Sequence, residues 1–263
     1  MVNWTDAHCH LQDRFRSDGE NRADIDDSLR RAYEAGVDRV VVIGTDAASS
    51  IEALAITGLG GPVEIFATVG LHPHDAKSDI GPILELARAG HPRLVGIGEC
   101  GLDYYYEHST RSDQRNAFAA QIALAHELDL ALVVHARDAF DDLIDIMASE
   151  GVPPRTVIHC FTGTAQDAQA CLDLGCDISI SGVVTFKNAQ TLREAVMIIP
   201  LDRLHVETDS PFLAPVPMRG KANEPALVGV VGEFVASLRG DDVSTLREAT
   251  AANTARLFGL PAR

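Results

Sequence analysis

The sequence is short of positive charge. Its 22 Lys and Arg residues stand against 38 Asp and Glu residues, which gives a formal net charge of -16 at pH 7. This deficit argues against a protein that wraps a long duplex, because such binding needs many cations that release counterions from phosphates. An anionic substrate would have to be held locally. A cluster of bound divalent cations could do this, because such ions reverse the local field.

The sequence also has no long hydrophobic run and few cysteines. An apolar run such as 40–43 is far shorter than the roughly 20 residues that span a bilayer, and the first eight residues show no basic and apolar leader pattern. We therefore expect a soluble, cytoplasmic protein with no membrane partner. The five cysteines are an odd number without paired spacing and are expected to be reduced, buried thiols; they are Cys9, Cys100, Cys160, Cys171 and Cys176.

Short stretches rich in Val, Ile and Leu alternate with longer amphipathic stretches along the 263 residues. Eight expected strands begin near Val2, Val37, Val63, Leu94, Leu130, Thr156, Asp177 and Arg203. The expected helices include 25–35, 80–88, 112–129, 139–149, 165–174 and 189–198, with two more at 225–238 and 244–258. Such alternation predicts right-handed βαβ units around a parallel sheet.

Eight βα units in about 250 residues match the size of a (β/α)₈ barrel. We therefore predict an α/β fold, a TIM-type barrel that forms a single domain over residues 1–263. A doubly wound open sheet is the alternative. The barrel is favoured because polar residues follow several different strands, and barrel enzymes place their catalytic groups at the C-terminal strand ends.

Six ionisable side chains at five expected strand ends are candidate metal ligands: His8, His10, Glu99, His135, His159 and Asp209. His8 and His10 are two residues apart on an extended segment, so both imidazoles project to the same side. Alone this pair would be weak, because motifs of this size often occur by chance. Six buried ionisable groups without a metal would carry a large desolvation penalty, which favours a metal site over a ring of paired core residues.

Two divalent metal ions fit this set better than one, because a single catalytic zinc commonly takes three protein ligands and a water. Glu99 lies between the two histidine groups around the barrel and is expected to bridge the ions. Asp209 is the expected general base for a bridging water, and Glu207 is expected to support the ligands from behind. The ligand types suit zinc, manganese or magnesium, and the metal's identity stays open.

Seven ordered motifs, which span nearly the whole chain, resemble the TatD family of metal-dependent deoxyribonucleases. They are DAHCH at residues 6–10, GLHPH at 70–74, IGECGLDY at 97–104, HARDA at 135–139, HCFTG at 159–163, ETDSP at 207–211 and RGKANEP at 219–225. The family's metal residues fall on the six positions already assigned. The departures are slight: Ala131 and Met218 replace residue types that are frequent in the family, and neither affects the metal chemistry.

Five further residues are expected to contact substrate at the mouth of the barrel: His72, Arg137, Phe161, Arg219 and Lys221. Arg137 could bind a phosphate, as Arg prefers bidentate contacts with oxyanions. Arg219 and Lys221 lie after the eighth strand, where barrels frequently bind phosphate. Phe161 is expected to stack on a terminal base. For each of these residues, an ordinary surface cation or a packed hydrophobic residue is the competing interpretation.

The leading functional hypothesis is a metal-dependent exonuclease that trims single-stranded or frayed DNA ends, and RNA as well. A carboxyl-ester or amide hydrolase, such as a D-aminoacyl-tRNA deacylase or a lactonase, is the second, because the same site could attack a carbonyl. A metal-dependent scaffold without turnover is the third. The fold alone cannot decide among them, since barrels host many chemistries. The sequence does not predict the oligomeric state.

Overall fold

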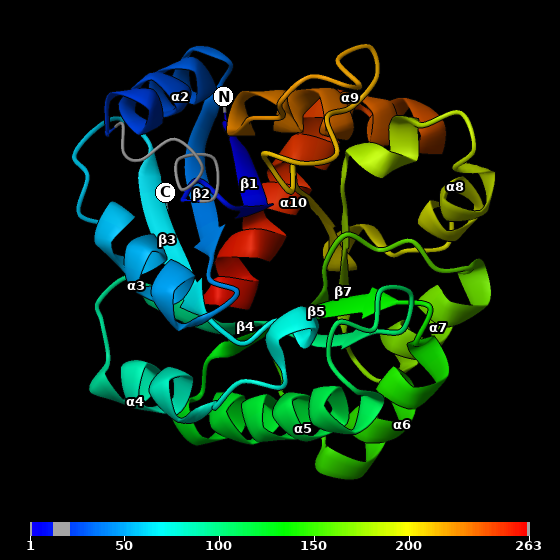
Figure 1. Cartoon of the computed structure of the whole chain (residues 1–263). Coiled ribbons are helices and arrows are strands. Elements are labelled where there is room, and N and C mark those ends of the chain that lie inside the picture. Colours follow the sequence, from blue (N-terminus) through cyan, green and yellow to red (C-terminus); the bar gives the residue numbers. More distant parts are fainter. Residues whose placement is uncertain (1, 13–21, 262–263) are drawn as a thin grey trace.

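The structure, a computed structural model, describes residues 2–12 and 22–261. Eight parallel strands pair in chain order from β1 to β8. They surround a central core, and helices form the outer layer (Figure 1). The strands are β1 Trp4–Cys9, β2 Val37–Ile43, β3 Glu64–Val69, β4 Leu94–Asp103, β5 Ala131–Arg137, β6 Thr156–Ile158, β7 Asp177–Ile180 and β8 Leu204–Val206. The predicted (β/α)₈ barrel is therefore confirmed.

The outer layer consists of α-helices that follow the strands, with short 3₁₀ turns at several loops. The α-helices are α2 Arg22–Glu34, α3 Ala47–Ile56, α4 Gly81–Ala89, α5 Arg111–Leu128, α6 Phe140–Glu150, α7 Ala165–Asp173, α8 Gln190–Val196, α9 Val228–Arg239 and α10 Val243–Phe258. The 3₁₀ turns are η1 Pro73–Asp75, η2 Gly182–Thr185, η3 Leu201–Arg203 and η4 Pro225–Leu227. No helix in the described ranges has the length and apolar character needed to cross a membrane.

Helix α3 is absent from the helices expected above. Its stretch AASSIEALAI contains a single charged residue, so polar and apolar faces are hard to distinguish in the sequence. Its start is nevertheless well defined, because the Asp46 side chain accepts from the Ser49 amide in a capping box. The Asp-x-x-Ser spacing at 46–49 was thus the available indication of this helix.

The barrel closes between β1 and the segment that follows β8. Cys9 and Ser210 form an isolated parallel bridge, and the Asp209 amide donates to the His8 carbonyl over 2.9 Å. The buried Asp6 carboxylate accepts from the Thr208 amide and hydroxyl, at 2.9 and 2.5 Å. These bonds place two candidate ligand segments, one from each side of the seam, next to each other.

A polar network closes the opposite, N-terminal end of the barrel. Asp177 begins β7. Oδ2 of its carboxylate lies 2.9 Å from Nε2 of the fully buried His205. The carboxylate also pairs with Arg203 at 3.1 Å and with Arg256 at 2.7 Å. The other ring nitrogen of His205 lies 2.9 Å from the Thr254 hydroxyl of α10. His205 is therefore a core residue of this network.

Candidate metal centre

The six expected metal ligands converge at the C-terminal rim of the barrel. His8 and Glu99 lie on β1 and β4, and His135 lies on β5. His10 and His159 directly follow β1 and β6, and Asp209 lies three residues after the end of β8. Four of them are almost fully buried, with exposed fractions of 1% for His8, 4% for His10, 3% for Glu99 and 4% for His159. They line or adjoin a cavity of about 860 Å³, which is in the usual size range of small-molecule sites.

One group of donor atoms surrounds Oε2 of Glu99. Nε2 of His8 lies 3.4 Å from this oxygen, and Nε2 of His10 lies 3.5 Å from it. The two imidazole nitrogens are 3.1 Å apart. Oδ1 of Asp209 lies 3.6 and 3.3 Å from the same two nitrogens. Ligands placed about 2.0–2.1 Å from a tetrahedral ion are about 3.3–3.4 Å apart. His8, His10 and Asp209 therefore form a triad that could hold one metal ion, and Oε2 of Glu99 lies beside its two imidazoles.

A second group surrounds the other oxygen of Glu99. Oε1 lies 2.8 Å from Nε2 of His159 and 3.0 Å from Nδ1 of His135, and these two nitrogens are 3.3 Å apart. Nε2 of His72 lies 3.2 Å from the same oxygen, so His72, expected as a substrate contact, also belongs to a potential ligand triad. The carboxylate of Glu99 thus divides its two oxygens between two groups of imidazoles.

The outer nitrogens of three imidazoles face oxygen atoms. Nδ1 of His10 lies 3.0 Å from the Ile43 carbonyl. Nε2 of His135 lies 3.2 Å from Oδ2 of Asp103, and Nδ1 of His159 lies 3.4 Å from Oε1 of Glu207. Histidine ligands of metals commonly donate their second nitrogen to a carbonyl or carboxylate, which fixes the tautomer and ring orientation. The contacts of His10 and His135 are of this kind, whereas Nδ1 of His159 lies near Glu207 without a hydrogen bond.

Charges within the cluster oppose the effect of burial. Burial works against the ionised form of Glu99, but the imidazoles around it, led by that of His159, hold the pKa of this carboxyl well below its usual range. Burial likewise disfavours the charged form of His159, yet Glu99 and Glu207 hold its pKa well above the ordinary value. For His72, burial dominates and lowers the pKa to about 4. The carboxylate of Glu99 therefore stays ionised among the imidazoles, and metal cations could take the place of the imidazole protons that balance it.

Glycines beside Glu99 allow the close strand packing that positions it. Gly98 has a φ of +130°, and a Cβ there would lie 2.4 Å from the Val133 carbonyl oxygen of the neighbouring strand. Gly101 has a φ of +126°, and a Cβ there would lie 2.1 Å from the carbonyl oxygen of His135. Any side chain at either position would force β4 and β5 apart and separate Glu99 from His135.

Phe161 does not line the mouth. Its side chain is 1% exposed, and its ring packs against that of Phe140 with 5.3 Å between the centroids. The expectation that it stacks on a terminal base is therefore wrong. Phe161 follows His159 by two residues, but Cys160 has a φ of +41°. This turn breaks the strand alternation and directs the phenyl ring into the core.

The three expected cationic contacts have different positions. Arg137 lines the cavity of the metal centre, where its guanidinium lies over the rings of Tyr105 and Tyr106 at 4.0 and 4.7 Å. Arg219 lies over the ring of Phe186 at 4.3 Å. Neither Arg219 nor Lys221 is among the residues that line the cavity, so only a substrate that extends beyond it could reach them.

Several residues of the site were not predicted from the sequence. Asp103 shares its strand face with Glu99, and this period-two spacing was the available indication. Its carboxylate also bonds Nε2 of His74 at 3.0 Å, and that ring lines the cavity. Cys160, expected to be a buried thiol, is half-buried and lines the cavity as well, as does His108.

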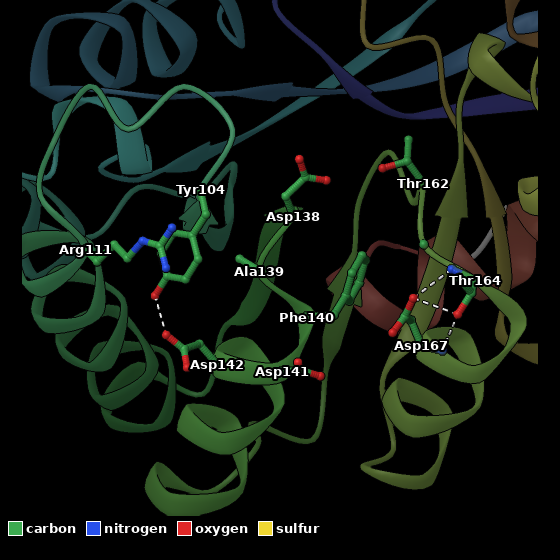
Figure 2. A pocket seen from close by; sticks show the side chains of 11 residues that line it. Tyr104, Arg111, Asp138, Ala139, Phe140, Asp141, Asp142, Thr162, Thr164 and Asp167 are labelled. Carbon is green, nitrogen blue, oxygen red and sulfur yellow. Dashed lines mark hydrogen bonds between the residues drawn. The ribbon is translucent and has the colours of Figure 1, made fainter.

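A second cavity of about 490 Å³ lies beside the first, and Asp138 and Thr162 line both. It is bordered by the start of α5, α6 and α7 (Figure 2). Four aspartates line it: Asp138, Asp141, Asp142 and Asp167. Figure 2 shows that Asp142 is bonded to the Tyr104 hydroxyl and Asp167 to Thr164. Arg111 is the one cation among these lining residues, so carboxylates outnumber cations on this neighbouring surface.

Imidazoles and carboxylates clustered at the C-terminal rim of a barrel are typical of metal-dependent hydrolases. Comparisons with known protein families and structures give the same class. The family model described as TatD related DNase matches residues 5–259. The chain belongs to the TatD family and is a metal-dependent hydrolase.

Individual relatives cover nearly the whole chain. It is 41% identical to the "Uncharacterized metal-dependent hydrolase YcfH" of Escherichia coli K12, over 98% of this chain and 96% of the relative. It is 40% identical to the "3'-5' ssDNA/RNA exonuclease TatD" of Erwinia tasmaniensis, over 90% and 94%. The crystal structure of YJJV, a TatD homologue from Escherichia coli K12, superposes with a TM-score of 0.91 at 27% identity, over 99% and 100% of the two chains.

Proposed function

We propose that the protein is a metal-dependent exonuclease that removes nucleotides from single-stranded or frayed DNA ends and also acts on RNA. The observation that carries this proposal is the division of the Glu99 oxygens between two groups of imidazoles, because two ions 3.5–4 Å apart are the usual clamp for phosphodiester displacement. The relatives named 3'-5' ssDNA/RNA exonuclease support the same reaction.

His8, His10, Glu99 and Asp209 would hold one ion, and Glu99, His135 and His159 would hold the other. When bound, the ions would act as Lewis acids on the phosphate and lower the pKa of a bound water. Glu99 would bridge and position them. Asp103 and Glu207 would keep His135 and His159 oriented through their outer nitrogens.

Asp209 and Arg137 have the other roles. Asp209 would accept the proton of the attacking water, since its carboxylate stands within the first donor group. Arg137 would hold a non-bridging phosphate oxygen, and His72, beside Glu99, would contact the same phosphate. Among the described residues no carboxylate forms an ion pair with Arg137, so its guanidinium is available to an anion. Arg219 and Lys221 would meet the strand outside the cavity.

The acidic body of the protein favours chain ends over duplex interiors. With a net charge of -16, the surface as a whole repels a polyanion, so attraction is restricted to the metal centre and the few cations beside it. A single-stranded terminus can enter the cavity without bringing a second strand along the acidic surface.

The test is mass analysis of the products from 12-mer single-stranded DNA and RNA, incubated with the protein and zinc, manganese or magnesium in turn. Nucleoside 5'-monophosphates released one at a time, and blocked by a 3'-phosphorothioate linkage but not a 5' one, are the expected result. The inactive control is the double variant His8→Ala/His135→Ala. Release of internal fragments, or turnover of aminoacyl esters and lactones without any turnover of oligonucleotides, would overturn the proposal.

A further inference from the structure

Phe212 is an exposed aromatic residue beside the metal centre. Its side chain is 53% exposed, whereas the other phenylalanines of the described ranges are buried or half-buried. It lines the same cavity as Glu99, His135 and Arg137. Its ring centroid lies 6.2 Å from that of His10, in an edge-on arrangement. A large apolar side chain thus meets solvent directly next to a candidate metal ligand.

The backbone that carries Phe212 is held on both sides. Its amide donates to the Asp209 carbonyl over 2.9 Å. Its carbonyl accepts from Nδ2 of the buried Asn223 over 2.6 Å, and the same amide group also bonds the Thr208 carbonyl at 2.8 Å. The ring therefore projects from a fixed turn, and little conformational entropy is lost when a flat ligand packs on it.

The guanidinium group of Arg137 lines the same cavity as Phe212. Arg137 comes from β5, across the barrel from the β8 segment that carries Phe212. The rings of Tyr105 and Tyr106 restrain its guanidinium. A ligand that satisfies both residues combines an anionic group with a flat aromatic group, which is the composition of a nucleotide.

The acidic neighbouring cavity indicates which side of the mouth receives the strand. Four aspartates, among them Asp138 and Asp141, line the neighbouring cavity with a single arginine, Arg111 (Figure 2). The excess of carboxylates disfavours a phosphate chain there. On the Phe212 side, the loops after β7 and β8 carry Arg219 over Phe186, together with Lys187 and Lys221. A nucleic acid strand that enters from this side passes Phe212 before its phosphate reaches the metals.

We propose that Phe212 is a specificity-determining residue that stacks on one of the two bases flanking the scissile phosphate. This proposal rests on the exonuclease function given above. Stacking on an exposed phenyl ring requires a base that is not already stacked within a duplex, so Phe212 favours single-stranded and frayed ends. It takes the role that was expected of the buried Phe161, and it lies in the same cavity as Tyr106, whose ring is restrained by Arg137.

The experiment couples Phe212→Leu to removal of a base. Cleavage of a single-stranded 12-mer is compared with cleavage of the same oligonucleotide carrying an abasic residue at the last or next-to-last position. On the intact oligonucleotide, Phe212→Leu is expected to lower kcat/KM by roughly 5- to 150-fold, which is the range that corresponds to the loss of one base stack. At one of the two abasic positions this penalty is expected to vanish, and Phe212→Trp is expected to retain the wild-type rate.

Tyr33→Leu is the matched control, because Tyr33 is an equally exposed aromatic residue, at 49%, on α2. Equal losses for Phe212→Leu on intact and on both abasic oligonucleotides would overturn the stacking role and leave the exonuclease function standing. If wild-type protein cleaves no oligonucleotide with any of the three metals, the exonuclease function fails and the stacking role fails with it.

Discussion

The two ends of the barrel differ in how their buried carboxylates are neutralised. At the N-terminal end, the Asp177 carboxylate is matched by two guanidinium groups and a buried imidazole, all from the protein itself. At the C-terminal rim, five imidazoles and two carboxylates face each other with no lysine or arginine among the donors. The first end is electrostatically complete. The second balances its carboxylates with imidazoles alone, where bound metal cations could replace protons. This difference separates a structural network from a candidate metal site.

Removal of metal should have the largest effect. Chelation followed by dialysis is expected to abolish turnover, and addition of zinc or manganese is expected to restore it with up to two ions bound per chain. Elemental analysis measures the stoichiometry. The double variant His8→Ala/His135→Ala should bind none, whereas His91→Ala/His126→Ala, which removes two exposed histidines, should bind as wild type does. Equal metal contents in the two double variants would refute the metal centre.

Asp209→Asn should lower kcat by about 10²–10⁴-fold, the usual contribution of a positioned acid or base. The substitution keeps the shape of the side chain, so the barrel should fold normally by circular dichroism. Asp145→Asn, on the exposed side of α6, is the control and should retain full activity. Turnover by Asp209→Asn within a few-fold of wild type would remove Asp209 from the mechanism.

Asp177→Asn tests the other end of the barrel and should affect stability rather than catalysis. We expect a loss of about 3 kcal/mol in the free energy of unfolding, the lower part of the range for a broken buried ion pair, because Arg203 and Arg256 are half-exposed. Urea unfolding measures it, with the exposed Asp173→Asn as control. Activity per folded molecule should be unchanged, and a selective loss of activity would contradict the comparison between the two ends.

The same variant has a defined pH dependence. Burial raises the pKa of Asp177, but His205 and the arginines outweigh it and hold the pKa below the ordinary value of 3.8. The stabilisation is therefore present above about pH 4 and is lost as the pH falls through the folded-state pKa. The difference in stability between wild type and Asp177→Asn should stay constant from pH 8 to pH 5 and shrink below pH 4. A difference that grows on acidification would contradict this assignment.

Asp103→Asn should give the smallest effect, about 10- to 100-fold in metal affinity or activity, as is typical for partners of ligand histidines. Its carboxylate contacts Nε2 of His135 and accepts from the amides of Tyr105 and Tyr106. Titration with zinc should show weaker binding, and excess zinc should restore most of the activity. Failure of excess metal to restore any activity would show that Asp103 acts on something other than ligand orientation.

The sequence predicted the barrel and the converging donors because both follow from short-range rules. Strand alternation and the spacing of His8 and His10 are local, and the C-terminal ends of parallel strands meet at one rim. The position of Phe161 could not be predicted this way, because a single positive φ at Cys160 reverses the side to which the next residue points. Phe212 was missed because its exposure depends on the turn that Asn223 holds from eleven residues away.

The contacts that close the barrel between β1 and the segment after β8 also determine when the donor group can form during synthesis. Asp6 and Thr208 are separated by 202 residues in the chain, and their bonds bring the His8 and Asp209 segments together. A ribosome-bound fragment that stops before β8 can hold His8, His10 and Glu99 but lacks the fourth donor of that group. Assembly of this binding site therefore waits for a contact of very high sequence separation, which forms late and slowly. Full occupancy by metal would consequently mark a finished barrel, because an unfinished chain lacks Asp209.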